Sequence, residues 1–148
     1  MESNAEMEAL RGYYLDELSV GQQAVFAKTV TEADILAYAG VSGDMNPVHI
    51  NEEFAKTTMF KTRIAHGMLS AGFISAVLGT KLPGPGCIYL SQTLKFMAPV
   101  KIGDTVLARA TVTEIVPEKK RVVLKTECLI AGKVVLDGEA TVMVPVRG

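Results

Sequence analysis

The chain has 148 residues, of which 49% are hydrophobic and 21% are charged, so it can bury a core without disulfides or a bound metal. Fifteen Lys and Arg residues nearly balance sixteen Asp and Glu residues, which leaves a net charge of -1. A chain this close to neutrality has no bulk field to attract nucleic acid or an anionic membrane, and we expect neither as a partner.

The N-terminal segment and the two cysteines bear on where the protein is located. The start, M-E-S-N-A-E-M-E-A-L, is acidic and lacks the apolar run of a secretory signal. We expect residues 1–12 to be a flexible leader and residues 13–148 to be a single domain. Cys87 and Cys128 are too few for a disulfide framework and too far apart for a C-x-x-C motif. We expect free, buried thiols and a cytoplasmic location.

The first half of the chain predicts one strand and two helices. A strand over residues 23–30 is followed by a helix over residues 32–41, whose start has the T-x-x-D spacing of a capping box. Pro47 disfavours helical backbone in the residue before it, so the chain must turn there. Asn51 can then cap a second, short helix over residues 52–57.

Residues 67–82 predict the central helix. Apolar side chains occupy nearly its whole circumference, which indicates a helix buried on most sides. Gly67, Ala71 and Ser75 recur at every fourth position and form a stripe of small residues. The stripe can pack tightly against a sheet or accept a ligand, and we expect packing to be its main use.

From Gly86 onward the sequence has the period of two that is typical of β-strands. Four long strands are expected, and turn residues at 117–120 and 131–133 make consecutive strands pair antiparallel. A helix against one face of an antiparallel sheet is an α+β arrangement. The residues expected on the apolar faces are Ile88, Leu90, Leu94, Phe96 and Ala98; Val106, Ala108, Ala110 and Val112; Val122, Leu124, Cys128 and Ile130; and Val134, Leu136, Ala140 and Val142.

The candidate chemistry lies around the only two histidines, His49 and His66. On a continuous helix Asp44 and His49 would lie about 140° apart around the axis, but Pro47 prevents that helix. A bent loop can instead bring the carboxylate and the imidazole to one point, where they can position and deprotonate a water molecule. The alternative is that Asp44 only forms a turn and His49 is a partly buried structural histidine.

His66 and Gly67 lie where the central helix is expected to begin. The first amides of a helix have no acceptor within it, and with the helix dipole they can hold a developing oxyanion. Alternatively, Gly67 only allows a tight entry into the helix and His66 only packs. Asp44, His49 and His66 formally match a two-histidine, one-carboxylate metal site. They lack a local ligand spacing, and we expect no metal.

The run Y-A-G-V-S-G-D-M-N-P-V-H-I-N, residues 38–51, resembles the hydratase signature of the (R)-specific enoyl-CoA hydratases in the MaoC-like group. The blocks I-A-H-G-M-L and L-P-G-P-G-C-I-Y-L-S-Q-T-L-K-F-M-A-P-V-K-I-G-D-T-V are also similar to that group, so the resemblance covers residues 20–144. It implies the hotdog fold, an acyl-CoA substrate, and a homodimer or higher homo-oligomer that joins sheets edge to edge. One departure is Arg63, where many relatives have proline.

The resemblance also implies roles for individual residues. Asp44 and His49 correspond to the catalytic pair, and the amide of Gly67 to the oxyanion donor. Ser75 matches a helix serine that lies near the catalytic aspartate in relatives, and Asn46, the last of the substrate-site residues, is expected to shape the loop rather than perform chemistry.

The reaction implied is reversible syn addition of water to a trans-2-enoyl-CoA, giving an (R)-3-hydroxyacyl-CoA. It needs no cofactor beyond the CoA of the substrate. Two alternatives stay open from the sequence. One is a hotdog acyl-CoA thioesterase, which would release free CoA thiol, and the other is a non-catalytic acyl-CoA-binding dimer.

Overall fold

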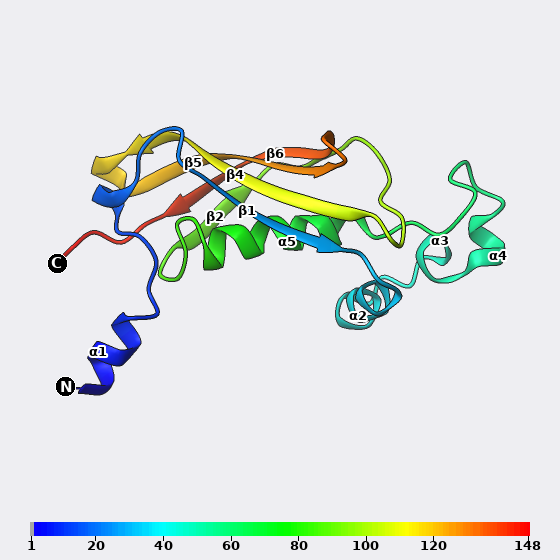
Figure 1. The fold of residues 1–148 in the computed structure, drawn as a ribbon, viewed down its shortest axis with the longest axis horizontal. Coiled ribbons are helices and arrows are strands. Elements are labelled where there is room, and N and C mark those ends of the chain that lie inside the picture. Colours follow the sequence, from blue (N-terminus) through cyan, green and yellow to red (C-terminus); the bar gives the residue numbers. More distant parts are fainter. Residues whose placement is uncertain (1) are drawn as a thin grey trace.

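A computed structural model describes residues 2–148 and shows an antiparallel sheet lying against one long helix (Figure 1). The α+β arrangement expected from the sequence is confirmed. The strands are β1 (Gln23–Thr29), β2 (Ile88–Gln92), β3 (Lys95–Phe96), β4 (Thr105–Val116), β5 (Arg121–Ile130) and β6 (Lys133–Met143). The α-helices are α1 (Glu2–Glu8), α2 (Glu32–Ser42), α3 (Pro47–Ile50), α4 (Glu52–Ala55) and α5 (Gly67–Thr80), and 3-10 turns occur at Leu15–Glu17 and Pro117–Lys119.

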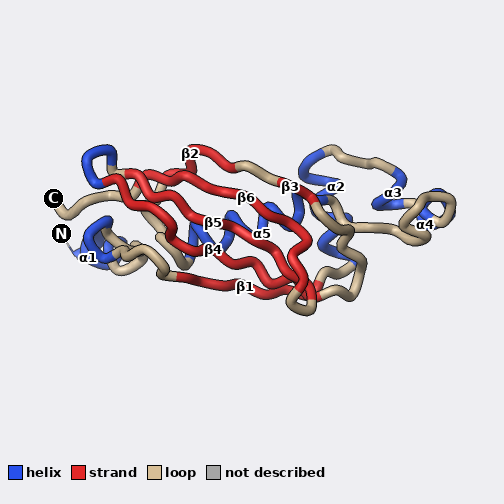
Figure 2. The backbone as a smooth tube through the Cα atoms, turned by 90° about the horizontal axis from the view of Figure 1, so that it is seen from above, coloured by secondary structure: helices blue, strands red, loops and turns tan. Residues whose placement is uncertain are grey.

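The strand order is β1-β4-β5-β6-β2, with β3 also paired to β6 (Figure 2). The consecutive strands β4, β5 and β6 pair as antiparallel hairpins, as predicted. Ala131 and Gly132 in the β5–β6 turn have φ values of 49° and 81°, the positive values that tight two-residue hairpins require. Full burial of Ala108, Leu124 and Ala140 confirms much of the alternation predicted for these strands. At the start of β6 the prediction is wrong, because a register shift at Cys128/Leu129 buries Val135 in place of Val134.

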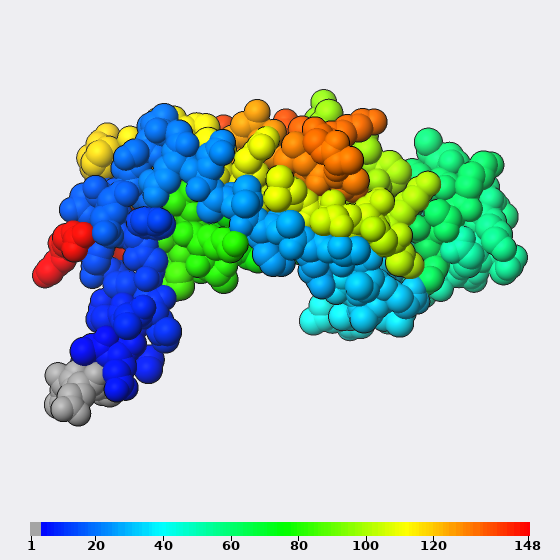
Figure 3. Space-filling model, in the orientation of Figure 1, coloured from blue at the N-terminus to red at the C-terminus, as the bar shows by residue number. Residues whose placement is uncertain are grey.

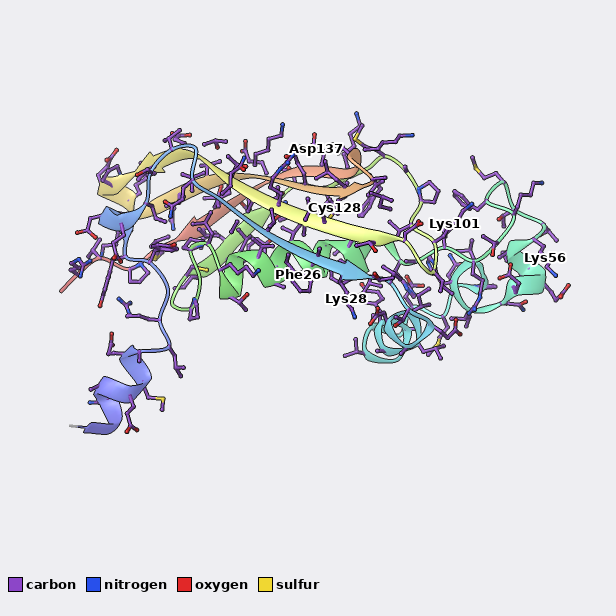
Figure 4. The ribbon with its side chains drawn as sticks, in the orientation of Figure 1. Phe26, Lys28, Lys56, Lys101, Cys128 and Asp137 are labelled. Atoms are coloured by element: carbon purple, nitrogen blue, oxygen red, sulfur yellow. The ribbon has the colours of Figure 1, made fainter. Side chains whose placement is uncertain are left out.

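The core lies between the concave face of the sheet and one side of α5. Phe26 of β1 meets Phe73 of α5 edge to face at a centroid distance of 6.0 Å, and Figure 4 shows Phe26 between the two elements. Cys128 is buried, and burial raises the pKa of its thiol to about 12. Cys87 is also a free thiol, but it is only half-buried. No helix among the described residues is long and apolar enough to cross a membrane.

The other side of α5 is open, so the prediction of a helix buried on most sides is wrong for the single chain. The buried side chains of α5 are Ser70, Phe73, Ile74, Val77 and Leu78. In contrast, Gly67 and Ser75 are exposed and Ala71 is half-buried. The small-residue stripe therefore does not pack tightly on this chain's sheet. Ala71 and Ser75 instead line a groove between α5 and the edge strand β2.

The strand expected over residues 88–98 is broken into β2 and β3, which corrects the prediction of four long strands. The carbonyl of Thr93 approaches β6 so closely that a Cβ atom on Gly138 would lie only 1.9 Å from its oxygen. Gln92 fills the break, since its Nε2 donates to Thr93 O and Thr126 Oγ1 at 2.8 Å each. Because β2 is an edge strand, Ile88 is 55% exposed rather than buried.

The N-terminal residues form the helix α1, and residue 1 lies outside the described residues. The expectation of a flexible leader over residues 1–12 stays a prediction. Five of the seven residues of α1 are Glu, Ala or Met, which are strong helix formers. Figure 3 shows α1 projecting from the body. The chain is then fixed to the domain, because the amides of Gly12 and Tyr13 donate to Pro85 O and Pro83 O at 2.8 Å each.

The helices α2, α3 and α4 gather at the end where α5 begins, opposite both termini (Figure 1). The predicted capping box of α2 is confirmed, since Thr31 N donates to Asp34 Oδ2 at 2.9 Å and Asp34 N donates to Thr31 Oγ1 at 3.2 Å. Lys28 of β1 pairs with Asp34 at 3.2 Å and so ties α2 to the sheet. Asn51 caps α4 as predicted, accepting from Phe54 N at 3.1 Å.

Candidate active site

The loop that carries the Asp-His pair is built by three consecutive local signals. Gly43 ends α2 in the left-handed conformation, with φ 81°. Asn46 then caps α3 by accepting from Val48 N at 3.1 Å, and Pro47 occupies the first position of that helix. Asp44 lies between the two helices, where its Oδ1 accepts from Asn46 N at 3.2 Å. This cap is in keeping with the loop-shaping role expected for Asn46, and its place among the substrate-site residues stays a prediction.

His49 is oriented by a backbone contact from the segment that leads into α5. Its Nδ1 lies 2.7 Å from the carbonyl oxygen of Ile64, and its ring is 8% exposed. A carbonyl oxygen can only accept, so Nδ1 carries the hydrogen and Nε2 of the neutral ring presents its lone pair. The amide of Ile64 also donates to Val48 O at 3.2 Å, which fixes α3 against this segment from both sides. His49 can therefore act through Nε2 as a proton acceptor.

His66 lies directly against the pair. Its Nε2 is 3.0 Å from the backbone oxygen of Asp44, and its ring stacks on the ring of His49 with centroids 3.9 Å apart. Tyr38 of α2 packs on the same ring at 4.6 Å. The prediction of a bent loop is consistent with this geometry, because a side-chain atom from each of Asp44, His49 and His66 lies within 4.8 Å of the other two. The sequence alone had no spacing that linked His66 to Asp44.

The same three residues raise the question of a metal. A zinc ion lies about 2.0–2.1 Å from each histidine nitrogen, along its in-plane lone pair. The two rings here are stacked with only 30° between their planes, so their lone pairs run side by side instead of converging on one ion. The prediction of a metal-free site stays a prediction, and the stacking favours it.

A cavity of about 490 Å³ opens at the start of α5. Gly67 is the first residue of that helix, so its amide has no acceptor within it. The absence of a side chain at Gly67 leaves this amide accessible beside the ring of Phe96. The polar residues lining the cavity are Asp44, His49, His66, Gly67 and Ser70, and the apolar ones include Met59, Phe60, Phe96, Met97, Val100 and Leu136.

Two serines of α5 differ from what the sequence indicated. Ser75, predicted as a site residue, does not line this cavity but the groove beside β2. It lies eight residues beyond Gly67, about 12 Å further along the helix axis. Ser70 was not singled out as a site residue, yet it is 2% exposed and lines the cavity, and its hydroxyl has no hydrogen-bond partner in the part of the chain that the structure describes. Only its position one turn after Gly67 could have indicated it.

Arg63 holds the segment that enters α5. Its guanidinium donates to both carboxylate oxygens of Glu32 in α2, at 3.0 and 2.6 Å, and its Nε lies 3.5 Å from Glu52 of α4. The hydrogen bond from Arg63 lowers the pKa of Glu32 below its ordinary value. Thr62 also donates to Glu52, at 2.8 Å. Arg63 therefore fixes the segment before Ile64 by ion pairs to two helices.

Comparison with known proteins places this site in a family. Residues 17–136 match the family described as MaoC like domain, and the chain belongs to it. It is 65% identical over 136 residues to the (R)-specific enoyl-CoA hydratase of Rhodospirillum rubrum, covering 92% of this chain and 94% of that protein. It is also 51% identical to the 3-hydroxybutyryl-CoA dehydratase of Methylorubrum extorquens, covering 92% and 87%.

The structural comparison agrees with the sequence. The R-hydratase PhaJ1 from Pseudomonas aeruginosa, in its unliganded form, superimposes with a TM-score of 0.87 and 50% identity, covering 92% of this chain and 88% of that one. The hotdog fold and the MaoC-like resemblance, both expected from the sequence, are confirmed.

Proposed function

We propose that the chain is an (R)-specific enoyl-CoA hydratase, a hydro-lyase that adds water reversibly and syn across a trans-2-enoyl-CoA. One observation carries the proposal. A carboxylate, an imidazole with a free lone pair, and the first amide of a helix border the same cavity. The names and high identities of the two curated relatives support the same reaction and substrate class.

The residues divide the chemistry between charge stabilisation and proton transfer. The Gly67 amide donates to the thioester oxygen, which gains enolate charge as the water oxygen bonds to C3. Asp44 and Nε2 of His49 hold that water, take one of its protons and deliver a proton to C2, so the elements of water are added without an external reactant. The pair acts as one coupled unit rather than as separately assigned acid and base.

The rest of the cavity fits an acyl thioester. Its walls are mainly apolar, with Met59, Phe60 and Leu136 among them, which suits an alkyl chain. Protonation and oxyanion binding suffice for this reaction, so the proposal includes no cofactor beyond the CoA of the substrate. A cytoplasmic location also belongs to the proposal, and the free thiols Cys87 and Cys128 are in keeping with a reducing compartment.

A homodimer completes the proposal. The edge strand β2 leaves backbone groups unpaired on one side, and its Tyr89 and Leu90 are 40% and 42% exposed. Beside it, Met68 of α5 is 49% exposed. An antiparallel pairing of β2 with the same strand of a second copy would extend the sheet and cover this apolar groove.

The hydratase proposal is tested by adding trans-2-butenoyl-CoA and following the loss of the conjugated thioester absorbance, with chiral analysis of the product. We expect Asp44→Asn and His49→Ala to lose at least about 100-fold in kcat, the scale of general acid–base catalysis. Asp137→Asn is the matched control, because Asp137 lies on the outer face of the sheet (Figure 4). Full activity in either site variant contradicts the mechanism, and release of CoA thiol in place of hydration indicates the thioesterase.

A further inference from the structure

His66 contacts both members of the proposed catalytic pair through different parts of one ring. Its Nε2 is 3.0 Å from the backbone oxygen of Asp44, and its face stacks on His49 at 3.9 Å. Because the Asp44 oxygen can only accept, Nε2 carries the hydrogen and donates it. The ring is 2% exposed and is held on one face by Tyr38 at 4.6 Å. A displacement of His66 would therefore shift the backbone of Asp44 and the ring of His49 together.

The position of His66 in the helix shows that this contact is not a by-product of helix formation. His66 is the N-cap residue of α5, where Ser, Thr, Asp or Asn would stabilise the helix by accepting from its free amides. Its side chain makes no such capping bond and is turned to Asp44 instead. The chain thus gives up a favourable cap at this position and gains a link across 22 residues to the Asp44 loop.

The remaining nitrogen also argues against a residue that only fills space. Nδ1 of His66 is buried and has no hydrogen-bond partner among the described residues. A packing residue would be apolar here, since burying a polar atom without a partner is unfavourable. The residue combines a donor toward Asp44, a stacking face toward His49 and a buried nitrogen without a partner among the described residues, and it lines the cavity together with both residues.

We propose that His66 is a positioning residue that sets the geometry of the Asp44–His49 pair, by donating from Nε2 to Asp44 O and by stacking on His49. This inference rests on the proposed hydratase function. It assigns His66 no contact with the reacting atoms. Its prediction is specific: loss of the Nε2 donor lowers kcat with KM little changed, because substrate binding is kept while the alignment of the pair is lost.

The test compares His66→Gln with His66→Asn in the trans-2-butenoyl-CoA assay. The amide nitrogen of Gln takes the place of Nε2 and can reach Asp44 O, whereas Asn is one methylene shorter and is a preferred N-cap. His66→Gln keeps the donor but loses the stacking ring, so we expect it to retain clearly more of the wild-type kcat than His66→Asn, which loses both contacts and on the order of 100-fold in kcat. Both variants leave space where the buried ring lay and should melt below wild type, so the comparison between them separates the donor from packing. His66→Ser, also a good cap that is too short to reach Asp44, repeats the test.

Val77→Ala is the matched control for destabilisation of α5. Val77 is fully buried in the same helix and does not line the cavity, so the variant should melt at a lower temperature with an unchanged kcat. Equal activity of His66→Asn and wild type overturns the inference, as does equal loss in the Gln and Asn variants or a comparable loss of kcat in Val77→Ala. Failure of the wild-type protein to hydrate the substrate overturns the proposed function itself. The assay of the wild type therefore distinguishes a wrong function from a wrong role for His66.

Discussion

Replacement of Gly67 by Ala tests whether the first amide of α5 binds the thioester oxygen. A Cβ atom at this position would lie 2.5 Å from Cε1 and 2.6 Å from Cδ1 of Phe96. Carbon atoms in contact are about 3.5–4.0 Å apart, so the Phe96 ring must move by about 1 Å or more. The ring is 54% exposed and can turn toward solvent. The new methyl group would then stand in the approach to the Gly67 amide.

The free energy of unfolding and the activity should respond differently to this change. Ala is favoured over Gly in a helix by up to about 1 kcal/mol, which offsets the displacement of Phe96. Blocking one oxyanion donor lowers kcat by about 100- to 1000-fold. We therefore expect Gly67→Ala to melt close to the wild-type temperature and to lose at least about 100-fold in the hydration rate.

The assay follows hydration of trans-2-butenoyl-CoA alongside a thermal melt. Gly79→Ala is the control, because Gly79 lies on the exposed side of the same helix and a Cβ atom there would meet nothing within 4 Å beyond its own helical turn. It receives the helix stabilisation without any change at the cavity. Wild-type activity in Gly67→Ala would refute the role of the Gly67 amide as oxyanion donor. A large fall in the melting temperature of this variant would show that the Phe96 ring cannot move aside.

Three further predictions concern residues outside the Asp-His pair. Ser70→Ala removes a buried hydroxyl that has no partner among residues 2–148 and should raise the free energy of unfolding by about 1 kcal/mol, whereas a decrease in a denaturant titration would reveal a bond to that hydroxyl. Arg63→Met should lower the melting temperature at pH 7. The pKa of Glu32 is depressed in the folded protein, so the contribution of this ion pair to stability is present above the ordinary pKa of 4.5 and is lost as pH falls below it. The difference in melting temperature between Arg63→Met and wild type should therefore narrow at low pH. A difference that stays constant with pH contradicts this ion pair. Leu90→Lys on β2 should convert the proposed dimer to a 15.8 kDa monomer in light scattering, and a wild-type protein already of that mass would contradict the dimer.

Local signals account for the parts of the fold that the sequence predicted. The capping box of Thr31 and Asp34 depends on residues three apart, and the hairpin turn at Ala131 and Gly132 depends on neighbours. The alternation of β4 from Thr105 to Val112 was readable because one face of the strand lies on the core of the same chain. The capping box and the turn depend on residues close together in the sequence, and the strand depends on a regular period of apolar residues.

The parts that the sequence missed depend on backbone groups far away along the chain. The break between β2 and β3 follows from the approach of Thr93 O to Gly138 on another strand. The orientation of His49 depends on Ile64 O, and that of His66 on Asp44 O, across 15 and 22 residues. Carbonyl acceptors carry no side-chain signature, so residue types and spacing cannot reveal them. The resemblance predicted roles for Asp44, His49 and Gly67, but it did not predict the backbone contacts of His49 and His66.

Ser75 shows how the groove and the proposed dimer depend on one another. The resemblance places this serine near the catalytic aspartate, yet in one chain about 12 Å of helix separate it from the start of α5, where Asp44 is bound. The two residues therefore line different hollows of one chain, and we propose that the Ser75 of a second copy is the one that approaches Asp44. Ser75 lines the groove beside β2, the surface that the proposed edge-to-edge pairing would cover. Asp44 is itself exposed in the single chain. Pairing through β2 would therefore bury apolar surface and bring a second chain's polar side chains toward the site in the same step.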